Sequence, residues 1–202
     1  MDICVNNIGG VWFGVACEMQ KVVATCFGGD EKEILKNLQQ IAQFKGPLQT
    51  PLKPSTFAEK TLSLMRSIYE GKHTSEDVPL SMEQLPAYTQ RILRTVSRIP
   101  IGYVSSYGGV AKAAGGGARA VGNAMACNPF APLVPCHRVV TSDLGLGGYS
   151  GNLRVKLELL ERERQGFTEA QEILVEGGGV LRVFPVEAVL KKFETSTKRK
   201  GH

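Results

Sequence analysis

The sequence predicts a two-part α/β protein, with a sheet and helices in the first part and mainly helices in the second. Three observations predict this. Two strand-type runs around a short turn fill residues 11–28, and stretches with helical spacing follow them. Beyond residue 86 short helical stretches alternate with glycines. The 202 residues, 43% of them hydrophobic, suffice for two small cores.

The N-terminal part is predicted to be a hairpin followed by two amphipathic helices. β-Branched and aromatic residues flank the turn at Met19-Gln20-Lys21. Gly28-Gly29 ends the second strand, and Asp30 can cap a helix whose apolar residues recur every three or four positions. A second helix is expected over about 56–70. Because residues 71–85 are polar and rich in turn formers, we place a domain boundary there and assign residues 1–85 to an N-terminal domain.

The second part contains a helix-turn-helix pattern. Ser105-Ser106 can cap a short helix, the three glycines at 115–117 end it, and another helix follows from Ala118 to about Ala126. We assign residues 86–170 to this domain and 171–202 to a C-terminal extension with a basic tail. Further helices are expected over 88–98 and 154–164, a hairpin over 173–184, and a last helix after Pro185.

Charge is unevenly distributed along the chain. The net charge is +5, with −2 in residues 1–85 and +7 in residues 86–202, much of it in the tail. Such an excess is compatible with a polyanionic partner, and a basic tail is equally typical of a solvated chain end.

Composition favours an intracellular protein, in the cytoplasm or, in a eukaryote, the nucleus. No apolar run reaches the ~20 residues of a membrane-spanning helix, and the N-terminus lacks the pattern of a signal peptide. The five cysteines are an odd number, so at least one thiol is free, as reducing compartments allow. Cys17 and Cys26 lie on the two expected strands, and either a disulfide between them or two buried free thiols would fit.

Cys136-His137 is the strongest local indication of chemistry. A thiolate is a strong nucleophile, and an imidazole can take its proton. Neighbouring side chains in an extended segment point to opposite faces, so either the chain turns here, as Pro135 favours, or a water bridges the two groups. The alternative is a small buried cysteine beside a surface histidine.

The surrounding motifs occur in one order at compact spacing. They are Ile99-Pro100-Ile101-Gly102-Tyr103-Val104-Ser105-Ser106-Tyr107, Ala118-Arg119-Ala120-Val121-Gly122, Asn128-Pro129, Pro135-Cys136-His137-Arg138-Val139 and Gly148-Tyr149-Ser150-Gly151. This set resembles the O6-alkylguanine-DNA alkyltransferase (methylated-DNA–protein-cysteine methyltransferase) family, densely over 86–165 and weakly over 1–85. The resemblance implies a ribonuclease-H-like α/β N-terminal domain and a mainly helical, winged-helix-like C-terminal domain.

The resemblance also implies roles for individual residues. Cys136 would accept the alkyl group, His137 would be its water-linked base, and Asn128 would brace the loop before the site. Glu163 would orient the histidine; Glu158 and Glu161 compete for this role, but counting from Val155-Lys156 selects Glu163. The implied substrate contacts are Tyr107 on the phosphate, Arg119 in the gap left by the base, Met125 lining the base pocket, and Tyr149, Ser150 and the Val139 carbonyl on the guanine.

Physical reasoning supports a DNA substrate and a single-use protein. The alkylated oxygen lies on the pairing edge of guanine, so the nucleotide must rotate out of the duplex at a cost of a few kcal/mol. A side chain such as Arg119 must then fill the gap from the minor groove. Since nothing regenerates a thiol from a stable thioether, we expect each molecule to act once. We also expect a monomer that binds double-stranded DNA and needs no cofactor.

Three positions depart from the family pattern. Asn123 stands where glycine is frequent, which puts groove contacts in doubt, and Ala131 replaces a pocket-lining proline, which puts the range of alkyl groups in doubt. The zinc ligands of some relatives are incomplete, because Cys4 and Cys17 are present but Val22 falls at a histidine position. We therefore predict no required metal.

Two other functions remain as alternatives. One is a non-catalytic helix-turn-helix protein that binds DNA or senses alkylation, although such relatives lack the cysteine. The other is a cysteine hydrolase with a Cys-His-Glu triad, which would turn over and need no DNA.

Overall fold

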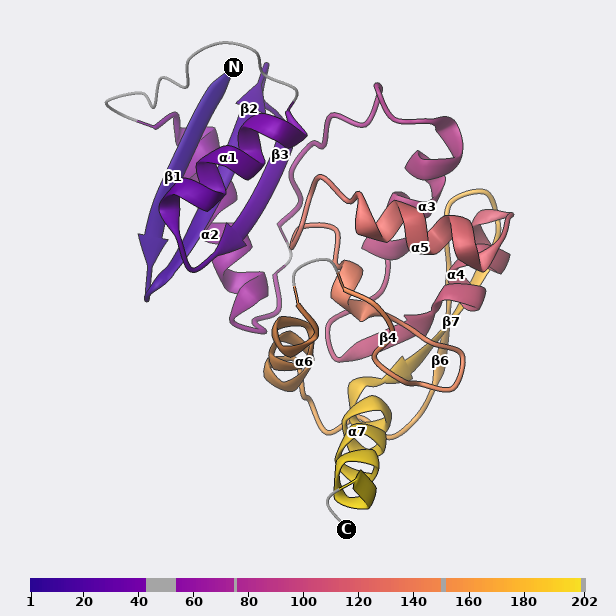
Figure 1. Ribbon diagram of the computed structural model, residues 1–202. Helices are drawn as coiled ribbons and strands as arrows, with labels where there is room; N and C mark the ends of the chain where they lie inside the picture. The colour runs from indigo at the N-terminus through magenta and orange to yellow at the C-terminus, as the bar shows by residue number, and fades with distance from the viewer. Residues whose placement is uncertain (43–53, 75, 150–151, 201–202) are drawn as a thin grey trace. The chain divides into compact units, whose positions relative to one another are not determined.

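The computed structural model describes residues 1–42, 54–74, 76–149 and 152–200, with side chains up to residue 196 (Figure 1). The chain forms two compact units. The first contains Met1–Tyr69, His73–Gln84 and Pro129–Leu133, and the second contains Glu70–Lys72, Leu85–Asn128 and Val134–His202. No helix in the described part of the chain is long and apolar enough to cross a membrane.

The first unit is built on an antiparallel sheet of order β1-β2-β3, with strands Asp2–Ile8, Val11–Glu18 and Lys21–Gly28. The predicted hairpin is confirmed as β2 and β3. Sequence analysis missed β1, because Asn6 and Asn7 on this edge strand are exposed and interrupt the apolar alternation. Pairing with β2 rather than local pattern defines the strand, with Cys4 opposite Val15.

Two helices cover opposite faces of this sheet, α1 (Glu31–Ile41) and α2 (Thr56–Tyr69), as Figure 1 shows. The Asp30 side chain caps α1 by accepting from the Glu33 amide at 2.9 Å, as predicted. Gly14 allows the close approach of α1, since a Cβ there would lie 2.5 Å from Ile34. On the other face, Phe13 packs edge-to-face with Tyr69 of α2.

The cysteines of the first unit are free thiols. Cys17 lies opposite Val22 and Cys26 lies opposite Gly14 in the register, so the possible Cys17–Cys26 disulfide does not form. In the described ranges no three His, Cys, Asp or Glu side chains gather as a metal site requires.

The second unit contains the predicted helix-turn-helix. Helix α4 (Tyr107–Ala114) ends at Gly115, whose left-handed conformation (φ +78°) turns the chain into α5 (Ala118–Ala126), and α3 (Ala87–Ser97) packs against both. Two strands within residues 171–185 complete the sheet of this unit, in which the strand order is β5-β4-β7-β6. The remaining elements are β4 (Tyr103–Ser106), β5 (Val139–Val140), α6 (Leu153–Arg162), β6 (Gln171–Leu174), β7 (Val180–Pro185) and α7 (Val186–Lys200).

The core of the second unit joins elements that are distant in sequence. Val104 of β4, Leu160 of α6 and Val189 of α7 are fully or almost fully buried in one cluster. The expected helices and the β6–β7 hairpin are confirmed, whereas the short strands β4 and β5 were missed because their pairing is long-range. The division of the chain at residues 85 and 170 stays a prediction, since compactness does not establish independent folding.

Replacing Ser106 with alanine should lower the free energy of unfolding by about 1 kcal/mol, because its side chain caps α4 by accepting from the Gly109 amide at 2.9 Å. Urea unfolding measures the effect, and Ser106→Thr, which keeps the hydroxyl, is the control. Equal midpoints for Ser106→Ala and the wild-type protein would show that the cap does not stabilise the helix.

Candidate active site

Cys136 lies in a tight turn at the base of a cavity in the second unit. Residues Cys136–Arg138 form one turn of 3-10 helix directly before β5, so the chain turns at the Cys-His pair. The thiol-bearing side chain is 5% exposed, and the cavity has a volume of about 590 Å³. It is lined by Tyr107, Ala118, Arg119, Gly122, Met125, Ala126, Cys136, Gly148 and Tyr149.

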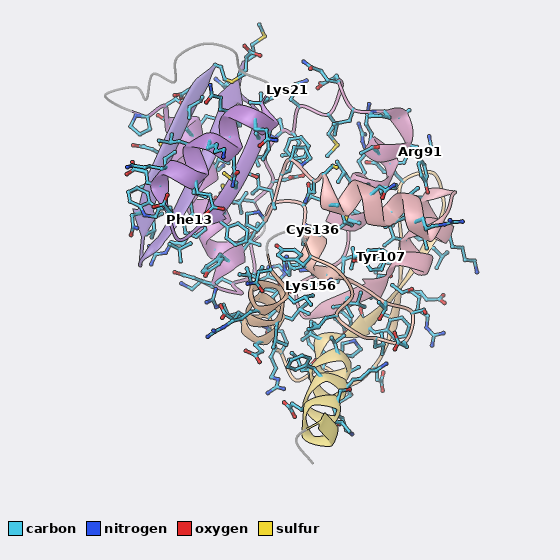
Figure 2. All side chains as sticks on the ribbon, viewed as in Figure 1. Phe13, Lys21, Arg91, Tyr107, Cys136 and Lys156 are labelled. Atoms are coloured by element: carbon cyan, nitrogen blue, oxygen red, sulfur yellow. The ribbon has the colours of Figure 1, made fainter. Side chains whose placement is uncertain are left out.

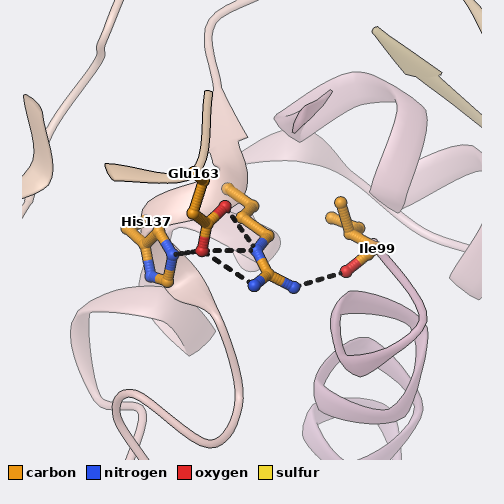
Figure 3. Close-up of polar contacts among 4 residues, drawn as sticks. Ile99, His137 and Glu163 are labelled. Atoms are coloured by element: carbon orange, nitrogen blue, oxygen red, sulfur yellow. Dashed lines mark hydrogen bonds and ion pairs between the residues drawn. The ribbon is translucent and has the colours of Figure 1, made fainter. Parts of the chain in front are cut away.

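Behind the cysteine, His137 and Glu163 form a buried hydrogen bond. The distance from His137 Nε2 to Glu163 Oε1 is 2.8 Å, and both side chains are almost wholly inaccessible to solvent (Figure 3). Glu163 was selected over Glu158 and Glu161 by counting residues, and the structure brings it to His137. Glu158 instead pairs with Arg154 on the surface.

Arg138 holds the carboxylate from the other side. Its Nε lies 2.9 Å from Glu163 Oε2 and its Nη2 lies 2.7 Å from Oε1, a two-point contact. Its Nη1 donates to the carbonyl of Ile99 at 2.7 Å, as Figure 3 shows. The sequence indicated no role for Arg138, because nothing in its local spacing distinguishes it from a surface cation.

The surroundings of Glu163 and His137 fix the charge states of these two side chains. Burial raises the pKa of Glu163, but the hydrogen bonds from His137 and Arg138 and the positive charge of Arg138 outweigh it and lower that pKa below its ordinary value. Burial lowers the pKa of His137, against the opposing effect of Glu163. At neutral pH the site therefore holds an ionised carboxylate and a neutral imidazole.

The tautomer of His137 follows from these charges. An ionised carboxylate only accepts hydrogen bonds, so Nε2 must carry the proton and donate it to Glu163. Nδ1 of the neutral ring is then an acceptor, and among the described residues it has no hydrogen-bond partner. The imidazole is thus oriented to take a proton at Nδ1.

The pKa of the Cys136 thiol is raised above its ordinary value, although several neighbours oppose the shift. Burial raises the pKa of Cys136, whereas hydrogen bonds from Asn128 and Tyr149 and the charge of Lys156 act to lower it. Asn128 also donates to the carbonyl of Val134 at 2.9 Å, so its amide braces the chain before the cysteine.

Lys156 is a site residue that sequence analysis missed. Its side chain is fully buried, and its Nζ donates to the carbonyls of Val139 at 2.6 Å and Gly148 at 3.3 Å. Burial lowers its pKa to about 8, against the charge of Cys136. Figure 2 shows Lys156, Tyr107 and Cys136 in one region of the second unit.

A signal for Lys156 was present in the helical spacing. The buried residues of α6 are Lys156, Leu159 and Leu160, at positions i, i+3 and i+4. A lysine on the apolar face of an amphipathic helix indicates a buried cation, which is rare without a partner or a function.

The expected substrate-binding residues lie mostly around the cavity. Tyr107, Arg119, Met125 and Tyr149 line it, and Arg119 is exposed on the first turn of α5. The Tyr107 hydroxyl donates to the Gly148 carbonyl at 3.2 Å. The Val139 carbonyl is engaged by Lys156, which leaves one lone pair for another donor. Ser150 lies outside the described residues.

Comparisons with known proteins identify the family. The family described as "6-O-methylguanine DNA methyltransferase, DNA binding domain" matches residues 87–165. A methylated-DNA–protein-cysteine methyltransferase of Methanothermobacter thermautotrophicus is 32% identical over 142 residues, which cover 70% of this chain and 78% of the relative. The chain belongs to this family. As a methylated-DNA–protein-cysteine methyltransferase, it reverses DNA damage directly by alkyl transfer.

Solved structures of family members share the fold. The O6-methylguanine-DNA methyltransferase of Pyrococcus kodakaraensis superposes with a TM-score of 0.63 at 30% identity, covering 80% of this chain and 98% of that one. The Mycobacterium tuberculosis OGT in complex with DNA gives 0.64 at 26% identity, with coverages of 81% and 93%. These similarities confirm the fold class predicted from the sequence.

Replacing Glu163 with glutamine should slow alkyl transfer by on the order of 10²–10⁴-fold, the usual contribution of a positioned base. The neutral amide removes the charge that would stabilise protonated His137, so the thiolate should form only at higher pH. The rate of reaction with free O6-benzylguanine as a function of pH measures both effects. Glu161→Gln, an exposed residue in the last turn of α6, is the control. An unmoved pH profile in Glu163→Gln would exclude the orienting role.

Proposed function

We propose that Cys136 is the single-use acceptor of the alkyl group and that the cavity above it receives an O6-alkylguanine rotated out of duplex DNA. The observation that carries this proposal is a buried thiol at the base of a cavity whose wall includes Arg119 and Tyr107, with an oriented imidazole behind it. The cavity volume of about 590 Å³ is in the range of small-molecule sites, ~300–1,000 Å³.

The transfer is a displacement at the alkyl carbon. The Cys136 thiol gives its proton to Nδ1 of His137 through a bridging water, and the thiolate forms a bond to the alkyl carbon. The bond from that carbon to O6 breaks, and its electron pair passes into the guanine ring, which takes up a proton. Hydrogen bonding to the base would relieve the developing charge, as Tyr149 can provide once its hydroxyl leaves the sulfur.

Lys156 supports the same step by its charge. Below pH 8 its ammonium is mostly protonated and stabilises a thiolate at Cys136 in surroundings of low dielectric. Its hydrogen bonds to Val139 and Gly148 hold the two segments that flank the base pocket.

Access to the base requires the duplex to open. We assign this to α5, whose first turn carries Arg119 beside small residues that let the helix approach a minor groove. Tyr107 would press on the phosphate of the rotated nucleotide, and Met125, Ser150 and the free lone pair of the Val139 carbonyl would contact the base.

The product is a stable thioether, so each molecule reacts once. The proposed reaction requires one copy of the chain and double-stranded DNA, and it requires no cofactor. A free Cys136 fits a reducing compartment, the cytoplasm or in a eukaryote the nucleus.

Mass spectrometry of the protein after incubation with duplex DNA containing O6-methylguanine tests the proposal. We expect one methyl adduct per molecule, located on Cys136 and absent from Cys136→Ala. Tight binding without an adduct would instead indicate a non-catalytic, alkylation-sensing protein. Repeated turnover would indicate a hydrolase.

Arg119→Ala should slow repair of duplex DNA by at least about tenfold while leaving the reaction with free O6-benzylguanine nearly unchanged. The free base needs no rotation out of a helix, whose cost is a few kcal/mol. Single-turnover rates on the two substrates measure the difference. Equal losses on both would place Arg119 in the chemistry rather than in opening the duplex.

A further inference from the structure

A second cavity of the second unit, with a volume of about 360 Å³, is rich in positive charge. Its walls come from α3, from the end of α4 and from the turn of the β6–β7 hairpin. Arg91 and Arg94 reach it from α3 and Lys112 from α4; Figure 2 labels Arg91 on its helix. Glu176, in the hairpin turn, is its one acidic lining residue.

The hairpin turn is held firmly against α4. A Cβ on Gly179 would lie 2.5 Å from the carbonyl oxygen of Ala113, so only glycine permits this approach. The neighbouring Val175 is buried, and its amide donates to the Gly179 carbonyl at 2.9 Å. Packing and hydrogen bonding therefore hold the wall that carries Glu176 in place.

The charges of the cavity are only partly neutralised. Three cations face one carboxylate, which leaves a formal charge of +2. Arg94 and Glu176 form an ion pair of 3.4 Å with side chains 50% and 71% exposed, a type of pair that contributes little to stability. Lys112 has no ion-pair partner in the described part of the chain. The α4 C-terminus contributes about half a negative charge, too little to reverse the sign.

The cavity lies only a few residues along the chain from α5, the helix proposed to enter the minor groove. Gly115 lies in its wall, and Arg119 follows four residues later. Four residues span at most ~14 Å of chain. A duplex carries one phosphate charge per ~1.7 Å of its axis, so a helix inserted at Arg119 has several phosphates within that reach.

We propose that Arg94 and Lys112 bind a backbone phosphate of the same duplex, beside the damaged nucleotide, and that Glu176 occupies this anion site in the free protein. The phosphate replaces the Glu176 carboxylate on Arg94. The site rests on the proposed repair function, and its competing carboxylate, Glu176, comes from a hairpin turn outside residues 87–165.

Removing the two cations and removing the carboxylate should change the affinity for DNA in opposite directions. The double variant Arg94→Gln/Lys112→Gln loses the phosphate contact, whereas Glu176→Gln removes the competing carboxylate and leaves both cations free. Arg91 is a poor test position, because its guanidinium also contacts the Ala114 carbonyl and the Tyr88 ring.

The experiment measures binding to an undamaged duplex over a series of salt concentrations. The double variant should bind several-fold more weakly, and the negative slope of log K against log salt should become shallower by about one, as the loss of one phosphate contact requires. Glu176→Gln should bind about two- to fivefold more tightly, the range of an exposed ion pair. Arg98→Gln, at the C-cap of α3 and outside the cavity wall, and Glu172→Gln, on β6, are the matched controls and should leave the slope unchanged.

The outcomes separate this site from the repair function. Thermal unfolding of each variant verifies the fold, and the wild-type protein is assayed in parallel for methyl transfer from duplex DNA. Transfer by the wild-type protein together with unaltered slopes in the double variant would overturn the phosphate site alone. Tighter binding by Glu172→Gln equal to that of Glu176→Gln would overturn it too, since a general charge effect would then suffice. Absence of transfer would count against the repair function.

Discussion

The active site depends on one buried carboxylate, that of Glu163. An ionised carboxylate out of water is stable only if it is fully paired, and Arg138 and His137 together supply its partners. Arg138 also reaches the carbonyl of Ile99, so a single cluster connects the end of α3, the Cys136 turn and the end of α6. Removing one partner of such a buried pair typically costs about 3–5 kcal/mol, which makes the geometry of the site inseparable from its stability.

The same burial sets the chemistry. In surroundings without water the thiol prefers its neutral form, and the lowered His137 pKa means that the imidazole is also neutral. The charge separation needed for attack is therefore supported by fixed groups, the Glu163 carboxylate behind the imidazole and the Lys156 ammonium near the sulfur. In the proposed mechanism a thiolate need exist only when the alkyl carbon is in place, which would protect a cysteine that reacts once.

Much of the fold was predictable because its elements carry local signals. Asp30 and Ser106 cap their helices through side chains that their positions in the sequence already indicated. The strands β1, β4 and β5 were not predicted, since each is defined by a partner strand rather than by its own alternation. Of the site, the motifs named Cys136, His137 and Glu163, but neither Arg138 nor Lys156 received a role. Arg138 looks like an ordinary surface cation until its burial is known, and the helical spacing that indicates a buried Lys156 does not show which groups it contacts.

The sequence by itself predicted Cys136 as the nucleophile and determined the helix-turn-helix and the family, because these depend on residue types at short spacing. Only the tertiary structure decided the direction of His137, the burial of Lys156 and the cavity formed by α3, α4 and the β6–β7 turn. These features join residues up to 88 positions apart, from Arg91 to Gly179, and no local pattern encodes such a meeting. Desolvation and charge pairing act through space, so their effect on reactivity appears only when the packed side chains are known.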